Sequence, residues 1–114
     1  MNLQIFGTKK CFATKKAERY FKERRIKYHF IDLAERGLSK GELQSVKSAV
    51  GLNSIIDCSA RDYKKLNMDR IIGSGVREEI LLNNPGLCKT PIVRNGKLAT
   101  VGYQPDVWKT WESE

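Results

Sequence analysis

The sequence has no long apolar run. Its longest uninterrupted hydrophobic stretches extend over only a few residues, as at residues 80–82, whereas a helix that crosses a bilayer needs roughly 20. Residues 1–6 also lack the basic flank, apolar stretch and small-residue cleavage site of a secretory signal. We therefore expect a cytoplasmic protein without a membrane partner.

Cysteine and histidine are scarce. The three cysteines, Cys11, Cys58 and Cys88, are odd in number and widely spaced, a pattern that fits neither a disulfide framework nor a zinc cluster. At least one thiol should therefore be free, and we expect neither a metal site nor a bound cofactor. The single histidine, His29, alternates with aromatic residues, which indicates an ordinary strand residue rather than a general base or a ligand.

Basic residues outnumber acidic ones by 21 to 13, which gives a formal net charge of +8. A field of this sign attracts polyanions, but acidic residues are interspersed among the basic pairs. The pattern favours a solvated basic surface, and after that an anionic substrate or an acidic protein partner, rather than direct binding to nucleic acid. With 40% hydrophobic and 30% charged residues, residues 1–114 are expected to form one globular domain.

The first third of the chain predicts a strand, a helix and a second strand. Residues 3–6 form a short apolar run that ends at Gly7, which is typical of a buried strand. From residue 13 to about residue 25 the apolar residues recur at helical spacing. Residues 28–33 are rich in aromatic and β-branched residues, as a strand would be. Such a unit usually pairs its strands in parallel through a right-handed crossover.

The middle third predicts helices and no strand. Ser39 and Glu42 have the spacing of a capping box, and the helix that follows them ends at Gly51. Further short helical pieces are expected at residues 54–58, 61–66 and 76–83. Residues from about 39 to 84 are therefore predicted to be a helical insertion.

The last third predicts a hairpin and a final helix. Asn95-Gly96 separates two strand-like runs, residues 91–94 and 97–101, and favours a type I′ turn because both central residues of that turn need a positive φ. Pro105 suits the first turn of a helix, whose apolar face would contain Val107, Trp108 and Trp111. The complete order, βαβ, helices, then ββα, predicts an α/β domain with a thioredoxin-like fold.

Cys11 lies between the first predicted strand and the first predicted helix. Unpaired backbone N–H groups and the positive end of the helix dipole at that place stabilise a thiolate over a thiol. Lys10 and Lys15 add positive charge nearby in the sequence and are candidate substrate- or thiol-binding residues. The alternative is that Cys11 is a small buried hydrophobic residue, but its polar and basic neighbours favour a reactive nucleophile.

Nearly the whole chain resembles one known family, and three blocks of sequence carry the resemblance: residues 7–11, 84–93 and 101–103. It is the family that contains the arsenate reductase ArsC and the transcription regulator Spx. The resemblance implies that Thr90-Pro91 is a cis bond facing the reactive cysteine, with Thr90 lining the site. A proline at the start of a strand can otherwise be trans and mark an edge.

The sequence departs from the arsenate reductases of this family at their three substrate-binding arginines. Asp57, Thr90 and Gln104 stand at those positions, and none of them offers the forked cationic group that suits Arg to an oxyanion. Arg61 and Arg94 are near in sequence, but a strand side chain such as that of Arg94 can point to the opposite face. Arsenate reduction by the usual scheme is therefore not expected.

The sequence also departs from the Cys-x-x-Cys switch of Spx, because Thr14 occupies the second position. No disulfide can form there, but Thr14 can donate a hydrogen bond to a Cys11 thiolate, as in monothiol members of the superfamily. Cys88 is a candidate resolving thiol if it reaches Cys11, or else an apolar strand residue. Cys58 is expected to be structural or an exposed bystander.

Two functions follow as expectations. In the first, the chain is an ArsC-like monothiol oxidoreductase that uses Cys11 as nucleophile, with an external thiol such as glutathione as co-substrate. In the second, it resembles Spx as a transcriptional regulator that binds RNA polymerase through the surface around Gly51. A third reading, loss of catalysis with the fold kept as a binding scaffold, stays open because fold does not fix function.

Overall fold

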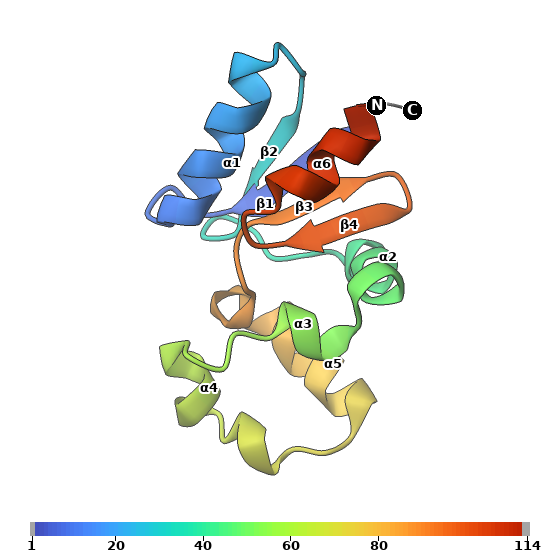
Figure 1. Ribbon diagram of the computed structural model, residues 1–114. Helices are drawn as coiled ribbons and strands as arrows, with labels where there is room; N and C mark the ends of the chain where they lie inside the picture. The colour runs from blue at the N-terminus through green and yellow to red at the C-terminus, as the bar shows by residue number, and fades with distance from the viewer. Residues whose placement is uncertain (1, 113–114) are drawn as a thin grey trace.

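The computed structural model describes residues 2–112 and contains a four-stranded sheet in the order β2-β1-β3-β4 (Figure 1). The strands are β1 (Leu3–Gly7), β2 (His29–Asp32), β3 (Ile92–Asn95) and β4 (Leu98–Val101). β1 is parallel to β2 and antiparallel to β3, and β3 is antiparallel to β4. The expected βαβ unit and ββα unit are both confirmed.

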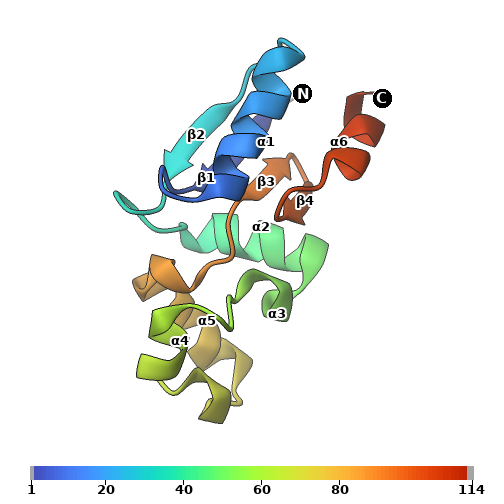
Figure 2. The same ribbon diagram turned by 60° about the vertical axis from the view of Figure 1, so that its left-hand side comes forward.

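Two helices cover one face of this sheet, α1 (Phe12–Glu23) and α6 (Pro105–Glu112) (Figures 1 and 2). Because side chains alternate along a strand, Leu3 and Ile5 pack against these helices while Phe6 points to the other face. The shared core on the first face includes Tyr20 and Phe21 of α1 and, from α6, Trp108 and Trp111. Val107, which we expected on this apolar face, is 40% exposed.

The other face of the sheet packs on the helical insertion, which begins with α2 (Lys40–Val50). The insertion continues through three α-helices and two short 3₁₀ helices, namely α3 (Leu52–Ile55), α4 (Arg61–Lys65), η1 (Met68–Arg70), α5 (Ser74–Asn83) and η2 (Pro85–Leu87). A helix is predicted at residues 54–58, but α3 begins two residues earlier and ends at Ile55, because Ile56 adopts an extended conformation. None of the helices within residues 2–112 is long and apolar enough to span a bilayer.

One β-bridge ties the insertion to the segment that leads into β3. Ile56 pairs with Cys88 in antiparallel fashion. Asp57 N–H donates to the Leu87 carbonyl, and Lys89 N–H donates to the Ile55 carbonyl, each at 2.7 Å. The expectation of no strand in the middle third overlooked this contact, which joins residues far apart in the sequence.

The hairpin turn differs from the prediction. Asn95 pairs with both Leu3 and Leu98, so the two-residue loop is Gly96-Lys97, one residue later than expected. Gly96 has a φ of +61°, whereas Asn95 does not have a positive φ. The type I′ prediction is therefore wrong. Glycine at the first central position is the pattern of a type II′ turn, and it lets Asn95 remain in the sheet.

Candidate active site

Cys11 is the N-cap residue of α1. Its N–H donates to the carbonyl of Thr8 and its carbonyl accepts from the N–H of Lys15, each at 3.2 Å. The first bond closes the loop after β1 and the second begins the helix. The thiol is partly exposed and lies beside the helix end, where N–H groups of the first turn lack helical partners.

Thr90 faces this thiol from just before the start of β3, the strand that pairs with β1. Its hydroxyl donates to Cys11 Sγ at 3.0 Å, and Sγ lies 3.8 Å from the Thr90 carbonyl oxygen. The Thr90-Pro91 peptide bond is cis, as the resemblance implied. Two residues 79 positions apart in the sequence are thus brought into direct contact.

Thr14 follows Cys11 by about one helical turn in α1 and is fully buried. Its hydroxyl oxygen has no hydrogen-bond partner in the thiol form among residues 2–112. A Cβ atom at Gly7 would lie 2.5 Å from the Thr14 side chain, so only glycine allows this approach of helix to strand. A buried hydroxyl without an acceptor is costly, and a Cys11 thiolate would supply that acceptor.

The environment favours ionisation of Cys11. Partial burial acts to raise the pKa of the thiol, but the hydrogen bonds that a thiolate would accept from the hydroxyls of Thr14 and Thr90 and from the backbone N–H groups of Thr14 and Ala13 outweigh it. The net effect is a pKa below its ordinary value. A thiolate is the reactive form of cysteine, so the geometry supports nucleophilic attack by Sγ.

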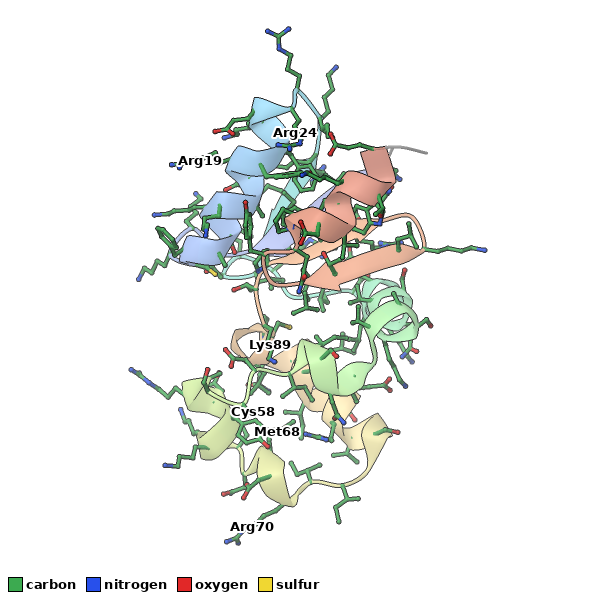
Figure 3. All side chains as sticks on the ribbon, in the orientation of Figure 1. Arg19, Arg24, Cys58, Met68, Arg70 and Lys89 are labelled. Carbon is green, nitrogen blue, oxygen red and sulfur yellow. The ribbon has the colours of Figure 1, made fainter. Side chains whose placement is uncertain are left out.

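A groove of about 580 Å³ opens beside Cys11. It is bounded by α1, α3, the segment before β3 and the end of β4, and its lining residues are Cys11, Ser54, Asp57, Lys89, Thr90, Val101 and Gly102. Figure 3 shows Lys89 where the sheet meets the insertion. Ser54, Lys89 and Gly102 come from segments that are far apart along the chain, so no local pattern in the sequence predicts that they share a groove.

The lysines expected near the thiol are arranged differently. Lys10 and Lys15 are exposed and are not among the residues that line the groove. Lys16 is instead held by aromatic rings, with Nζ 4.6 Å from the ring centre of Tyr103 and 5.8 Å from that of Phe12. Its charge therefore lies over the loop after β4.

The three positions that would hold arginines in an arsenate reductase are only partly brought together. Asp57 and Thr90 line the groove, but Gln104 lines a neighbouring hollow, and its amide donates to the Val101 carbonyl at 3.3 Å. Arg94 donates to the Gln4 side chain at 2.9 Å, and Arg61 lines a separate hollow on the insertion. Within residues 2–112, no arginine lines the groove beside Cys11.

The model of the ArsC family matches residues 6–111 of this sequence. The chain belongs to the ArsC family. It is 28% identical over 111 residues to the uncharacterized protein YusI of Bacillus subtilis, which covers 93% of this chain and 94% of that protein. It is 30% identical over 110 residues to the global transcriptional regulator Spx 2 of Oceanobacillus iheyensis, covering 93% and 80% of the two chains.

Solved structures agree with the thioredoxin-like fold. An arsenate reductase from Vibrio cholerae superposes with a TM-score of 0.84 at 22% identity, over 94% of each chain. This likeness shows that the present ArsC-family chain shares the fold of that enzyme.

The other two cysteines of this ArsC-family chain lie outside the groove. Cys88 is 5% exposed and packs in the core beneath the sheet, where burial raises its pKa to about 12. Cys58 is exposed on the insertion (Figure 3), where it neighbours Tyr63. The pKa of that phenol is raised by burial and by the charge and hydrogen bond of Cys58.

Gly51 lies at the corner between α2 and α3 and is exposed. Its φ is +85°, a conformation that glycine adopts without strain. A Cβ atom there would have no neighbour within 4 Å. The corner is therefore open surface, and its backbone conformation alone accounts for glycine.

Proposed function

We propose that this ArsC-family protein is a monothiol oxidoreductase in which Cys11 is the nucleophile. The observation that carries the proposal is the Cys11 thiol held 3.0 Å from the Thr90 hydroxyl above the buried, unpartnered hydroxyl of Thr14. These donors stabilise a thiolate at the edge of an open groove. A thiolate placed in this way is suited to attack an oxidised sulfur.

The reaction would run by thiol-disulfide exchange. The Cys11 thiolate attacks one sulfur of a disulfide, the bond between the two substrate sulfurs breaks, and the other sulfur leaves as a thiolate. An external thiol such as glutathione then attacks the substrate-derived sulfur of the mixed disulfide and releases Cys11. Cys88 is a poor resolving thiol, because a buried sulfur with a pKa of about 12 ionises too rarely.

The groove does not support arsenate as the substrate. A carboxylate, Asp57, and a neutral hydroxyl, Thr90, occupy two positions at which the arsenate reductases of this family have arginines. A carboxylate in the same groove as the thiol repels an oxyanion. A reducing compartment such as the cytoplasm would suit the three free thiols.

The test is the glutathione-linked reduction of a disulfide by the wild type, by Cys11→Ser and by the matched control Cys58→Ser. We expect turnover in the wild type and in Cys58→Ser, and none in Cys11→Ser. Alkylation of Cys11 should be half-maximal at a pH below the ordinary pKa of a thiol, because the pKa of Cys11 is lowered. An ordinary alkylation midpoint together with no Cys11-dependent turnover would exclude this function.

A second candidate is a regulator that binds RNA polymerase through the corner at Gly51. It is supported by relatives that are named global transcriptional regulators and by the exposure of this corner. We would compare pull-down of RNA polymerase by the wild type, by Gly51→Arg and by Gly41→Arg, a control at an exposed α2 position with no neighbour near its Cβ. Loss of binding in Gly51→Arg alone, with both variants folded, supports the regulator. No binding by the wild type at micromolar concentration contradicts it.

A further inference from the structure

The groove beside Cys11 contains one acidic and one basic side chain, Asp57 and Lys89. The β-bridge between Ile56 and Cys88 fixes both. Asp57 follows one bridge residue and Lys89 follows the other, and the N–H of each donates a 2.7 Å hydrogen bond across the bridge. Their backbones are therefore held at the groove by the same contact that joins the insertion to the segment before Pro91.

Neither charge is neutralised within the part of the chain that the structure describes. The salt bridges there join Arg24 to Glu112, Arg36 to Glu42, and Lys47 to Glu78. Asp57 Oδ1 accepts hydrogen bonds from Ser59 N–H at 2.9 Å and from the Ser59 hydroxyl at 2.6 Å. These bonds orient the carboxylate without supplying a positive charge, and Lys89 is exposed. Both groups are available to a ligand in the groove.

We propose that the groove selects a disulfide whose reacting sulfur belongs to an amino-acid-like zwitterion, with the substrate ammonium against Asp57 and the substrate carboxylate against Lys89. This inference rests on the proposed function, since Cys11 must attack that sulfur. Complementary charges steer a ligand and fix its orientation. A protein charge also repels a ligand group of the same sign, which disfavours the wrong ligand. Asp57 stands where the arsenate reductases of the family have an arginine, and its negative charge suits a substrate ammonium rather than an oxyanion. Lys89 provides the positive charge that binds the substrate carboxylate.

Cystine is the simplest disulfide of this class. The Cys11 thiolate attacks one cystine sulfur, a new bond forms between that sulfur and Sγ, the cystine S–S bond breaks, and one cysteine thiolate departs. Two related disulfides each lack one of the charged groups. Cystamine retains the ammonium groups without carboxylates, and dithiodipropionate retains the carboxylates without ammonium groups.

The experiment measures the rate at which each disulfide modifies Cys11, by intact mass spectrometry of the full chain in a Cys58→Ser background. Each rate is divided by the rate with a small free thiol, which removes the intrinsic reactivity of the disulfide. We expect cystine to react about tenfold faster than the other two on this scale, as one charge-assisted contact would give. Asp57→Asn should slow cystamine and speed dithiodipropionate, whereas Lys89→Gln should slow dithiodipropionate.

The crossed response of the two variants is the signature of charge recognition, because a distorted groove would change all three rates in the same direction. Glu35→Gln and Lys97→Gln remove the same charges at exposed positions outside the groove and should leave the preferences unchanged. Equal normalised rates for the three disulfides, or parallel changes in both groove variants, would overturn the inference and leave the proposed function standing. No reaction of Cys11 with any disulfide would overturn both.

Discussion

Thr14 distinguishes this site from a redox centre with two neighbouring cysteines. Its side chain occupies the place of the second thiol, one helical turn from Cys11, and is completely buried. Because its hydroxyl has no hydrogen-bond partner in the thiol form within residues 2–112, it lowers the stability of the fold while it favours the thiolate. Under the proposed function, the residue would serve reactivity at the expense of stability.

Thr14→Val should separate these two effects. Loss of the hydroxyl removes one of the donors that lower the pKa of Cys11, so we expect the midpoint of Cys11 alkylation to move to higher pH. Loss of an unsatisfied buried hydroxyl should also raise the free energy of unfolding by about 1 kcal/mol. Thr110→Val is a matched control, because that hydroxyl is exposed and bonds to a carbonyl in α6. A stabilised variant with an unchanged alkylation midpoint would contradict the role of Thr14.

Gly7→Ala should disturb the same site from the strand side. The new methyl group would lie 2.5 Å from Thr14, and such overpacking costs about 1–3 kcal/mol. We expect a lower free energy of unfolding in denaturant titrations and slower alkylation of Cys11. The double variant Gly7→Ala, Thr14→Ala should recover stability because it removes the overlap. Gly41→Ala, a helix position with no neighbour within 4 Å, should not destabilise the fold, and equal losses in both alanine variants would refute the argument.

The residues of the site differ in how far the sequence reveals them. Thr90-Pro91 is implied by the family resemblance, whereas Cys11 could be found because it lies at the boundary between a predicted strand and a predicted helix. Lys89 could not, because it reaches the groove through the bridge between Ile56 and Cys88, for which the sequence contains no local pattern. Lys10 shows the opposite error, since closeness to Cys11 in sequence does not bring it into the groove.

At the scale of elements, α2 has the most complete local signal in the chain. The Ser39 side chain accepts from Glu42 N–H at 3.2 Å, and the Glu42 carboxylate accepts from Ser39 N–H at 2.8 Å. The same carboxylate accepts two hydrogen bonds from Arg36, and its pKa is lowered chiefly by that guanidinium. The predicted capping box is confirmed, since both of its partners lie within four residues. The hairpin turn is not predicted correctly from local sequence. Its register depends on the pairing of Asn95 in the sheet rather than on the Asn-Gly pair.

Ser39→Ala should weaken the start of α2. Loss of a serine cap typically costs about 1 kcal/mol, and α2 contributes Leu43 and Val46 to the core under the sheet. We expect the midpoint of urea unfolding to fall without a change in its slope. Ser48→Ala, an exposed interior position of the same helix, should be neutral or slightly stabilising because alanine favours helix. Equal effects of the two substitutions would show that the cap contributes nothing.

Over the whole molecule, the fold places two thiols in environments that shift their pKa values in opposite directions. Cys11 lies at a helix end among donors that lower its pKa. Cys88 lies in the apolar layer shared by the sheet and the insertion, and burial raises its pKa to about 12. The two thiols must therefore affect the stability of the fold in opposite ways as the pH rises.

The free energy of unfolding of three proteins tests this contrast: the wild type, Cys88→Val and Cys11→Ser. The neutral Cys88 thiol contributes stability that is fully present below its ordinary pKa of 9.0 and is lost as the pH rises toward a folded-state pKa of about 12. Above that ordinary pKa, the free energy of unfolding of the wild type should fall by up to about 1.4 kcal/mol per pH unit relative to that of Cys88→Val. Urea titrations in reducing buffer would measure the difference.

Cys11 should give the opposite slope. Its lowered pKa contributes stability that is present above the ordinary thiol pKa of 9.0 and is lost as the pH falls through the folded-state value. The free energy of unfolding of the wild type should therefore increase relative to that of Cys11→Ser as the pH rises toward 9.0. If neither difference varies with pH, the two thiols share one environment and the assignment of Cys11 as the single reactive thiol fails. If the slopes have opposite signs, the fold itself separates the nucleophile from the buried thiol.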